Sequence, residues 1–502
     1  MRFLASAVVL ALALPSLASC ITFVPDVRPP YADRKFHSSA IDDFIASSLP
    51  KFSDPQLATL FQNTFPNTLD TTVYQAVPGD SFIITGDIDA MWLRDSCNQV
   101  LPYVPFAASD PSLSSLLQGI VLRMSRSVLL DPYANAFNLN GTLPLGAQSD
   151  IRTPPMTWPV FEGKYELDSL AAFLKLSRSV YAVAPEMLSD DDNLATWLAA
   201  VDAVVSTITE QQKSTDEDSD LLDSGHPAFL FKRSTTQASD TLIQDGRGSP
   251  NSKTGMSRCS FRPSDDAVVL PFLVPANAMA VVELRKVAEV VGDVEKNRAG
   301  GNNGGAKSFG KAKRNGSRLV ELEATLRRLA NEIDAGIQNF GRGVNSVTGD
   351  VTYFYEVDGF GNMLFMDDAN IPGLLSLPYL GYVDKTDSVY LATRKAVLSR
   401  STNPYFFKGL AGEGVGGPHA GYGMIWPMSI MIRALTSTSD DEIKDCLDTL
   451  VKSSAGKGFM HESFWKNDVG NFSRPWFAWA NSLFGELIIT LMEERPYLIL
   501  KQ

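Results

Sequence analysis

The sequence has few of the residues that bind zinc or cross-link small folds, with four cysteines and four histidines among 502 residues. The cysteines form no Cys-x-x-Cys pair, and the histidines are scattered along the chain. These absences argue against a zinc site built from nitrogen and sulfur ligands and against a disulfide framework. Cys97, Cys259 and Cys446 allow at most one disulfide among themselves, and the sequence leaves open whether it forms.

Long apolar runs and an excess of positive charge are also lacking. After the first 20 residues, no segment approaches the roughly 20 consecutive apolar residues that a membrane-spanning helix needs. The formal net charge is −13, which argues against nucleic-acid phosphate as a partner. With 44% hydrophobic and 20% charged residues, the composition is that of an ordinary globular protein. We therefore expect neither a membrane span nor a nucleic-acid partner.

The first 19 residues predict a secretory signal peptide. Arg2 supplies the positive charge, residues 3–14 the apolar stretch, and residues 16–18 a small-residue cleavage site. Residues 17–20 also resemble a bacterial lipoprotein box, in which Cys20 would carry lipid, and this alternative stays open. The sequons at Asn140, Asn315 and Asn471 favour a glycosylating secretory pathway, hence a secreted glycoprotein.

Most of the remaining chain has the 3.6-residue apolar periodicity of helices. About a dozen helices joined in antiparallel pairs, with little strand and no fixed repeat, predict one domain over residues 20–502. Acid-bearing loops between the helical hairpins suggest a closed ring of helices, an α/α toroid, around a central pocket. Residues 295–318 are glycine-rich and basic, which predicts a disordered insertion between two helices.

Residues 86–104, GDIDAMWLRDSCNQVLPYV, combine acids, an arginine and a tryptophan at the expected start of a helix. Asp89 is the predicted N-cap, because its carboxylate can accept bonds from free backbone N–H groups. Trp92 and Asp95 then share one helical face, where a ring could stack on a sugar and Arg94 with a carboxylate could bind hydroxyls. The alternative is a capped helix with an internal Arg94–Asp95 pair.

Three further loops carry carboxylates beside aromatic residues or glycines: Ser-Asp-Asp at 264–266, Asp-Asp at 367–368 and His-Glu at 461–462. Hydrolysis of a glycosidic bond needs one protonated carboxyl and one ionised carboxylate in different surroundings. Each loop alone has a simpler explanation as a helix cap or a surface turn. Together they predict a carbohydrate pocket in an all-α ring.

Six long segments, in order along the chain, carry a resemblance to one known family. They are GDIDAMWLRDS (86–96), FRPSDDA (261–267), PFLVPANAMAV (271–281), MDDANIPGLLSLPYLGY (366–382), GMIWPMSIMIRALTS (423–437) and the block from MHESF to LFGELI (460–488). From about residue 36 to 498 the chain closely resembles glycoside hydrolase family 125, the metal-independent exo-α-1,6-mannosidases. The resemblance implies an all-α (α/α)6 barrel, a six-hairpin toroid, with minor β-hairpins in its loops.

For function, the resemblance implies removal of non-reducing terminal α-1,6-linked mannose with inversion, without metal or cofactor. The expected partners are α-mannoside oligosaccharides or mannosylated glycans, and we expect a monomer. The general base falls on Glu462. The general acid falls on Asp265 by analogy with related α/α-barrel hydrolases, with Asp266 as the alternative. The residues that fall in the substrate-binding blocks are Trp92, Arg94, Asp95, Asp368, His419, Trp426, Arg474 and Trp476.

Two other classes of protein use similar residues. A calcium-dependent mannosidase or a phosphohydrolase would use the carboxylate clusters as metal ligands, and a chelator would abolish its activity. A carbohydrate-binding protein without catalysis would keep the tryptophans, would not need Asp265 or Glu462, and would release no mannose.

Overall fold

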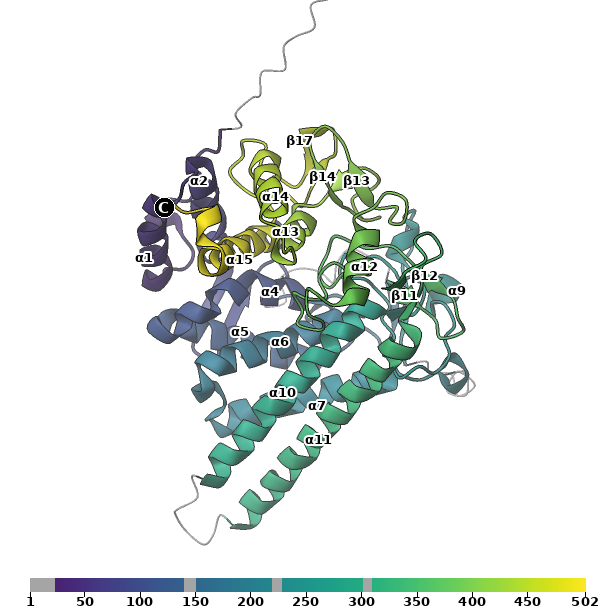
Figure 1. Cartoon of the computed structure of the whole chain (residues 1–502). Coiled ribbons are helices and arrows are strands. Elements are labelled where there is room, and N and C mark those ends of the chain that lie inside the picture. Colours follow the sequence, from purple (N-terminus) through teal and green to yellow (C-terminus); the bar gives the residue numbers. More distant parts are fainter. Residues whose placement is uncertain (1–22, 140–149, 219–227, 301–308) are drawn as a thin grey trace, which may run out of the picture.

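The computed structural model describes residues 23–139, 150–218, 228–300 and 309–502. The predicted signal peptide, Cys20 and the sequon at Asn140 lie outside these residues. Within them, helices form the body of the molecule and short antiparallel strands form many of the connections (Figure 1). Among the described residues no helix combines the length and apolarity needed to cross a membrane.

The helices fall into short N-terminal ones and longer ones that pack in pairs. They are α1 (Ser39–Ser48), α2 (Pro55–Thr64), α3 (Asn67–Thr71), α4 (Leu93–Val100), α5 (Pro111–Leu130), α6 (Leu167–Val183), α7 (Asp191–Glu210), α9 (Ile243–Gly246), α10 (Val274–Gly300), α11 (Phe309–Phe340), α12 (Ser388–Val397), α13 (Pro427–Leu435), α14 (Asp440–Ser453) and α15 (Ala478–Glu494). Side-chain caps define several starts. At α5, the Asp110 carboxylate accepts from the N–H groups of Ser112 and Leu113, with Pro111 at the first helical position.

In the described part of the chain the strands form seven small sheets, whose hydrogen-bonded orders are β1-β2, β3-β4-β6, β5-β7, β8-β11-β12, β9-β10, β13-β14 and β15-β16-β17. Their bounds are β1 (Val73–Val77), β2 (Asp80–Ile83), β3 (Met91–Trp92), β4 (Ala136–Phe137), β5 (Ile151–Thr153), β6 (Val160–Glu162), β7 (Leu230–Lys232), β8 (Phe272–Leu273), β9 (Arg342–Val344), β10 (Val351–Tyr353), β11 (Glu356–Val357), β12 (Met363–Leu364), β13 (Phe406–Lys408), β14 (Glu413–Val415), β15 (Met424–Ile425), β16 (Ser463–Trp465) and β17 (Asp468–Ser473). The strand pairings in these sheets are antiparallel, and the sheets connect helices that are separate in the sequence.

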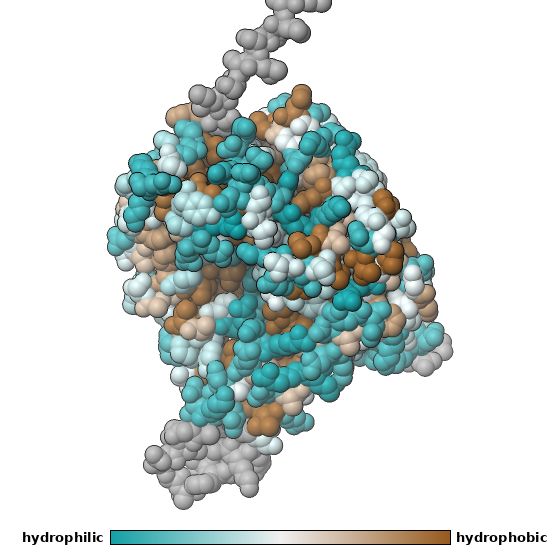
Figure 2. Space-filling model, viewed as in Figure 1, coloured by the Kyte–Doolittle hydropathy of each residue, from teal (hydrophilic) through white to brown (hydrophobic). Residues whose placement is uncertain are grey.

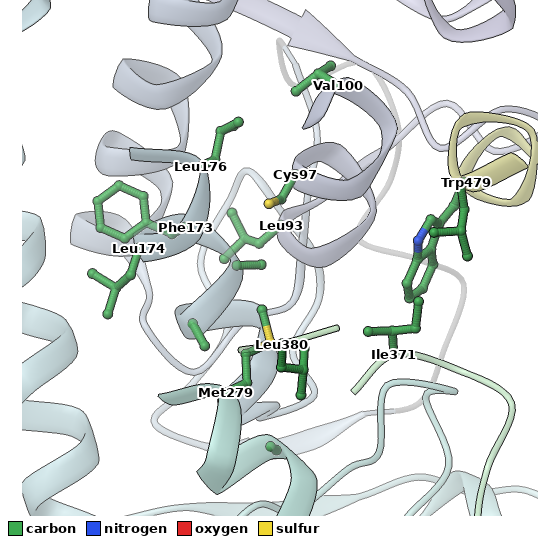
Figure 3. Packing of buried hydrophobic residues seen from close by; sticks show 14 of the residues in the cluster. Leu93, Cys97, Val100, Phe173, Leu174, Leu176, Met279, Ile371, Leu380 and Trp479 are labelled. Atoms are coloured by element: carbon green, nitrogen blue, oxygen red, sulfur yellow. The ribbon is translucent and has the colours of Figure 1, made fainter. Parts of the chain in front are cut away.

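Helix α4 lies at the centre of the core. Leu93 and Cys97 point from it toward α6, while Trp479 of α15 lies on its other side (Figure 3). Every residue of α4 is buried, including Arg94 and Asp95. In contrast, the face shown in Figure 2 is covered mostly by hydrophilic residues, with hydrophobic ones interspersed.

The prediction that Asp89 caps this helix is wrong. Asp89 is exposed in a bend, and α4 begins at Leu93 with Trp92 in the N-cap position and no side-chain cap bond. The reason is a pairing distant in sequence, because Met91 and Trp92 form β3 against Phe137 and Ala136 of β4. The helix therefore begins three residues later than the local pattern suggests.

Part of the range predicted as a disordered insertion is helical. Helix α10 continues to Gly300 and α11 begins at Phe309, so helices occupy both ends of the range 295–318, and residues 301–308 lie outside the described part. Glu, Lys, Arg and Ala favour helix, and the two helices lie side by side for most of their length (Figure 1). Arg298 forms an ion pair with Asp191, and Arg318 forms one with Asp202, both on the surface.

Cys97, Cys259 and Cys446 are buried free thiols, so the described residues contain no disulfide. The open question of a bridge among these three is thereby answered.

Candidate active site

A pocket forms where the start of α4, the 263–265 loop, the paired strands β15 and β16 and the start of α15 converge. The space in and above it that is free of protein atoms, open solvent included, is about 400 Å³. Its lining consists of aromatic, charged and small polar residues: Thr85, Ile88, Trp92, Arg94, Asp95, Pro263, Ser264, Asp265, Asn370, His419, Trp426, Glu462, Arg474, Phe477 and Trp479. Segments almost 380 residues apart in sequence thus supply one site.

Most of the predicted site residues meet in this pocket. Eight of them line it: Trp92, Arg94, Asp95, Asp265, His419, Trp426, Glu462 and Arg474. Asp266 and Asp368 lie directly behind the lining, because the Ser264 hydroxyl donates to both carboxylates, at 3.2 and 2.9 Å. Trp476 is not part of the lining. Its ring lies against Gly86, where an added Cβ would come within 3.1 Å of it.

The 262–266 turn gives its two aspartates different surroundings. Asp265 has a left-handed backbone (φ 66°), which aspartate tolerates better than most residues, and its N–H donates to the Arg262 carbonyl at 2.9 Å. The Arg262 guanidinium anchors the turn through Nε to Glu356 of β11, at 2.6 Å. As a result, the Asp265 side chain is 27% exposed in the pocket, whereas that of Asp266 is 1% exposed. This geometry favours Asp265 over Asp266 as the group that reaches a substrate.

Positive charge and hydrogen bonds surround Asp265. Its Oδ1 accepts from Arg94 Nη2 and from Asn135 Nδ2, each at 3.3 Å, and Lys164 Nζ donates to its carbonyl at 2.8 Å. Burial opposes ionisation, but the charges of Arg94 and Lys164 outweigh it, so the pKa of Asp265 lies well below its usual value. In the unliganded protein this carboxyl is ionised.

Glu462 immediately precedes β16 and is held from both sides. Its Oε2 accepts from the Ser473 hydroxyl at 2.8 Å, and its Oε1 lies 3.2 Å from Arg474 Nε. Arg474 itself has a left-handed backbone (φ 51°), and its carbonyl lies 3.0 Å from His461 Nδ1. Its Nη1 reaches Asp87 at 3.0 Å. These contacts fix the orientation of the Glu462 carboxylate in the pocket wall.

The third sequon is part of this same support. Asn471 is exposed in β17, and its partner Ser473 bonds both Glu462 and, at 2.6 Å, the hydroxyl of Ser463. Ser473 therefore has a structural role independent of glycosylation. The second sequon, at Asn315, lies within α11.

His419 provides a positive charge at the pocket. Its Nδ1 lies 3.7 Å from Asp266 Oδ1. Burial would lower the pKa of His419, but its interactions with Asp266, and the charges of Asp265 and Glu462, raise it to about 9. The imidazole is thus protonated at neutral pH and can donate hydrogen bonds. Trp426 meets the His419 ring edge-on, with centroids 6.1 Å apart.

Among the described residues, no group of three or more His, Cys, Asp or Glu side chains is placed to hold a metal ion. The carboxyls on the Arg94 side of the pocket instead converge on its guanidinium. What the lining can do chemically is proton transfer by two carboxyls, together with the binding of hydroxyls by charged and aromatic side chains.

Some residues of the site were not predicted from the sequence. Asn370, Phe477 and Trp479 line the pocket, and each lies within one of the long segments that carry the family resemblance. Trp479 also lies under the Arg94 guanidinium, whose central carbon is 5.8 Å from the centroid of the Trp479 ring. Asn135, which contacts Asp265, lies outside those segments and had no sequence signal.

Buried acids and His419 predict that the folded state is most stable at mildly acidic pH. Burial raises the pKa of Asp95 to about 6 and that of Asp367 to about 7, so the folded state holds protons that the unfolded chain loses above about 4. The raised pKa of His419 adds stability that is complete below its usual 6.5 and is lost as pH rises through about 9. All three effects lower stability as pH rises.

We therefore expect Tm to fall steadily from pH 5 to pH 9 in calorimetry at constant ionic strength. In His419→Gln the decline between pH 6.5 and 9 should become shallower. A Tm that is constant or higher at pH 9 contradicts this assignment of protonation states.

A helix-rich fold that brings two carboxyls from different elements into an aromatic pocket is the arrangement of an α/α glycoside hydrolase. A family model described as metal-independent alpha-mannosidase (GH125) matches residues 54–489. The chain therefore belongs to this family of metal-independent α-mannosidases, and the predicted (α/α)6 fold class is confirmed.

Two relatives support this assignment. The chain is 43% identical to the meiotically up-regulated gene 157 protein of Schizosaccharomyces pombe over 493 residues, which cover 95% of this chain and 90% of that protein. It is also similar to a solved structure of a Streptococcus pneumoniae metal-independent α-mannosidase, described as a non-productive substrate complex with α-1,6-mannobiose. That match has a TM-score of 0.76 and 34% identity, and covers 92% of this chain and 100% of the other.

Proposed function

We propose that this α-mannosidase is secreted, acts from the non-reducing end, and releases terminal α-1,6-linked mannose with inversion. The observation that carries the proposal is the convergence of Asp265 and Glu462 on one pocket from different elements and in different surroundings. The α-1,6 linkage is supported by the α-1,6-mannobiose bound in the similar Streptococcus pneumoniae structure. Secretion is supported by the pattern of residues 1–19 and by the exposure of Asn471.

The two carboxyls divide the work of a single displacement. Asp265 donates a proton to the glycosidic oxygen as the bond to the anomeric carbon breaks, while Glu462 takes a proton from the attacking water. The bonds from Ser473 and Arg474 hold the Glu462 carboxylate toward that water. In inverting enzymes the two carboxyls stand about 6.5–9.5 Å apart, and we expect this spacing when substrate is bound.

The rest of the lining binds and orients one sugar ring. Arg94 and Asp95 are buried at the floor and can hold hydroxyls, and protonated His419 can donate to another. Trp92, Trp426 and Phe477 surround the remaining space with apolar surface. A pocket with a buried charged floor suits a terminal residue, which supports exo action.

The test uses protein recovered from the culture medium of a secreting eukaryotic host. The N-terminal residue of the recovered protein should be Cys20. The protein is assayed on α-1,2-, α-1,3-, α-1,4- and α-1,6-mannobiosides, and kcat/KM should be highest for the α-1,6 compound by at least about tenfold. Proton NMR of the first sugar released should show β-mannose. Initial α-mannose contradicts inversion, and binding without any release indicates a carbohydrate-binding protein.

A further inference from the structure

A second layer of buried carboxyls lies behind Asp265. Four carboxyls face the Arg94 guanidinium: Asp95 at 3.6 Å, Asp168 and Asp265 at 3.3 Å each, and Glu166 in a direct ion pair. The side chains of Glu166 and Asp168 are completely buried. Of the four, only Asp95 and Asp265 line the pocket, so the role of Glu166 cannot be contact with substrate.

Glu166 and Asp265 are held side by side by the same two donors. Asn135 Nδ2 donates to Glu166 Oε1 at 3.1 Å and to Asp265 Oδ1 at 3.3 Å. The guanidinium of Arg94 likewise bonds both carboxyls, through Nη1 and Nη2. Glu166 occupies the N-cap position of α6 but makes no side-chain capping bond. Because one amide nitrogen donates to both carboxyls, Glu166 Oε1 and Asp265 Oδ1 lie side by side.

The negative charge of this cluster requires that some of its carboxyls stay protonated. Four ionised carboxyls around one guanidinium, two of them completely buried, would leave negative charge that water cannot fully solvate. Burial, with the charges of Asp265 and Asp168, raises the pKa of Glu166 well above its usual value despite Arg94. The pKa of Asp265, in contrast, is lowered. In the free protein, the proton of the pair therefore resides on Glu166.

We propose that Glu166 is a positioning residue that stores the catalytic proton and passes it to Asp265 when substrate fills the pocket. This inference rests on the proposed function, because it assigns the leaving-group proton to Asp265. It explains how a carboxyl that is ionised in the free enzyme can act as a general acid.

The steps balance in protons. A terminal mannoside displaces water from around Asp265, and the proton moves from Glu166 Oε1 to the neighbouring Asp265 Oδ1. Asp265 gives it to the glycosidic oxygen, while the attacking water loses one proton to Glu462. After the products leave, Glu462 releases its proton to solvent and the Glu166–Asp265 pair takes one up.

Other titratable groups face this pair and bear on its pH dependence. They are Arg94 and Asp95 of α4, Asp168 of α6, Glu162 and Lys164 of the β6–α6 connection, Cys259, and His419. Arg94 and Lys164 remain charged throughout the working range, and burial keeps the Cys259 thiol protonated. The pKa values of Asp95 and Asp168 are raised to about 6 and that of His419 to about 9, so variants must be compared over a full pH profile.

The decisive variant is Glu166→Gln, which keeps the shape and hydrogen bonds of the side chain but has no proton to transfer. We expect kcat/KM for α-1,6-mannobiose to fall by about 10²–10³-fold, because its alkoxide leaving group needs the proton. For 2,4-dinitrophenyl α-mannoside, whose leaving group needs none, the loss should be under about tenfold. The alkaline limb of the mannobiose profile should move to lower pH.

Asp168→Asn is the matched control, since Asp168 pairs with the same Arg94 and hydrogen-bonds neither Asn135 nor Asp265 in the described residues. Whatever its effect on overall rate, it should keep the wild-type ratio of the two substrates. Equal losses on both substrates in Glu166→Gln, with an unmoved pH profile, overturn the proton-store role. If Glu166→Gln does not fold, Glu166→Asp is used in its place. Its shorter carboxyl should lower kcat/KM for mannobiose more than kcat/KM for the dinitrophenyl substrate. Equal losses on the two substrates overturn the proposal. If the wild type releases no mannose, it is the proposed function that fails instead.

Discussion

Asp265→Asn should lower kcat/KM for α-1,6-mannobiose by about 10³-fold while costing less than about tenfold on 2,4-dinitrophenyl α-mannoside. An amide has the size and hydrogen-bonding reach of the carboxyl but cannot protonate the glycosidic oxygen. The dinitrophenolate leaves without a proton, so its cleavage needs only the water, Glu462 and the bound sugar. The side chain of Asp265 reaches the pocket, which makes it the group positioned for this transfer.

The control is Asp266→Asn, in the same turn. Asp266 is buried, accepts from Ser264 and pairs with His419, so its loss should weaken sugar binding through His419 and affect both substrates alike. If Asp266→Asn produces the leaving-group difference and Asp265→Asn does not, then Asp266 is the acid. If neither substitution changes activity, the acid lies elsewhere and the assignment to this turn is wrong.

Much of the fold could be predicted from the sequence because the pattern that indicates a helix lies within the helix itself. The apolar periodicity and caps such as Asp110 are properties of neighbouring residues. The start of α4 could not be read in this way. Its position depends on β3 pairing with β4, whose partner residues Ala136 and Phe137 are more than forty positions away. A two-residue strand has no periodicity to detect.

The pocket lining was predicted mainly where residues lie in long characteristic segments. Trp92, Asp265 and Glu462 are examples, and all three line the pocket. The supporting contacts were harder to predict because they involve single polar residues with no local pattern. Ser473 was noticed only as part of a sequon, and Asn135 was not noticed at all, although each holds one of the two carboxyls.

Side-chain direction and protonation were beyond the sequence for a different reason. Trp476 lies one position before Phe477, yet only Phe477 lines the pocket, because the ring of Trp476 packs on Gly86. The state of Asp265 depends on the balance between burial and the charges of Arg94 and Lys164, which come from elements far away in the chain. In the sequence the immediate neighbour of Asp265 is another acid, Asp266, whereas the structure surrounds Asp265 with the cations of Arg94 and Lys164.

Glu462→Gln should reduce kcat/KM on both substrates by a similar factor, about 10³-fold. Both reactions need a base to take the proton of the attacking water, whatever the leaving group. The amide can still accept from Ser473 and remain near Arg474, so the pocket should keep its shape. Steady-state kinetics on the two substrates, with circular dichroism to verify folding, measures this effect.

Azide distinguishes a lost base from a distorted pocket. The anion needs no deprotonation, so in Glu462→Gln it can replace water and attack the anomeric carbon of dinitrophenyl α-mannoside, restoring the rate and forming β-mannosyl azide. Ser473→Ala is the matched control, because it loosens the carboxylate without removing it, and azide should then give no rescue. Formation of α-mannosyl azide contradicts a single displacement from the Glu462 side. Full activity of Glu462→Gln with water alone shows that another group is the base.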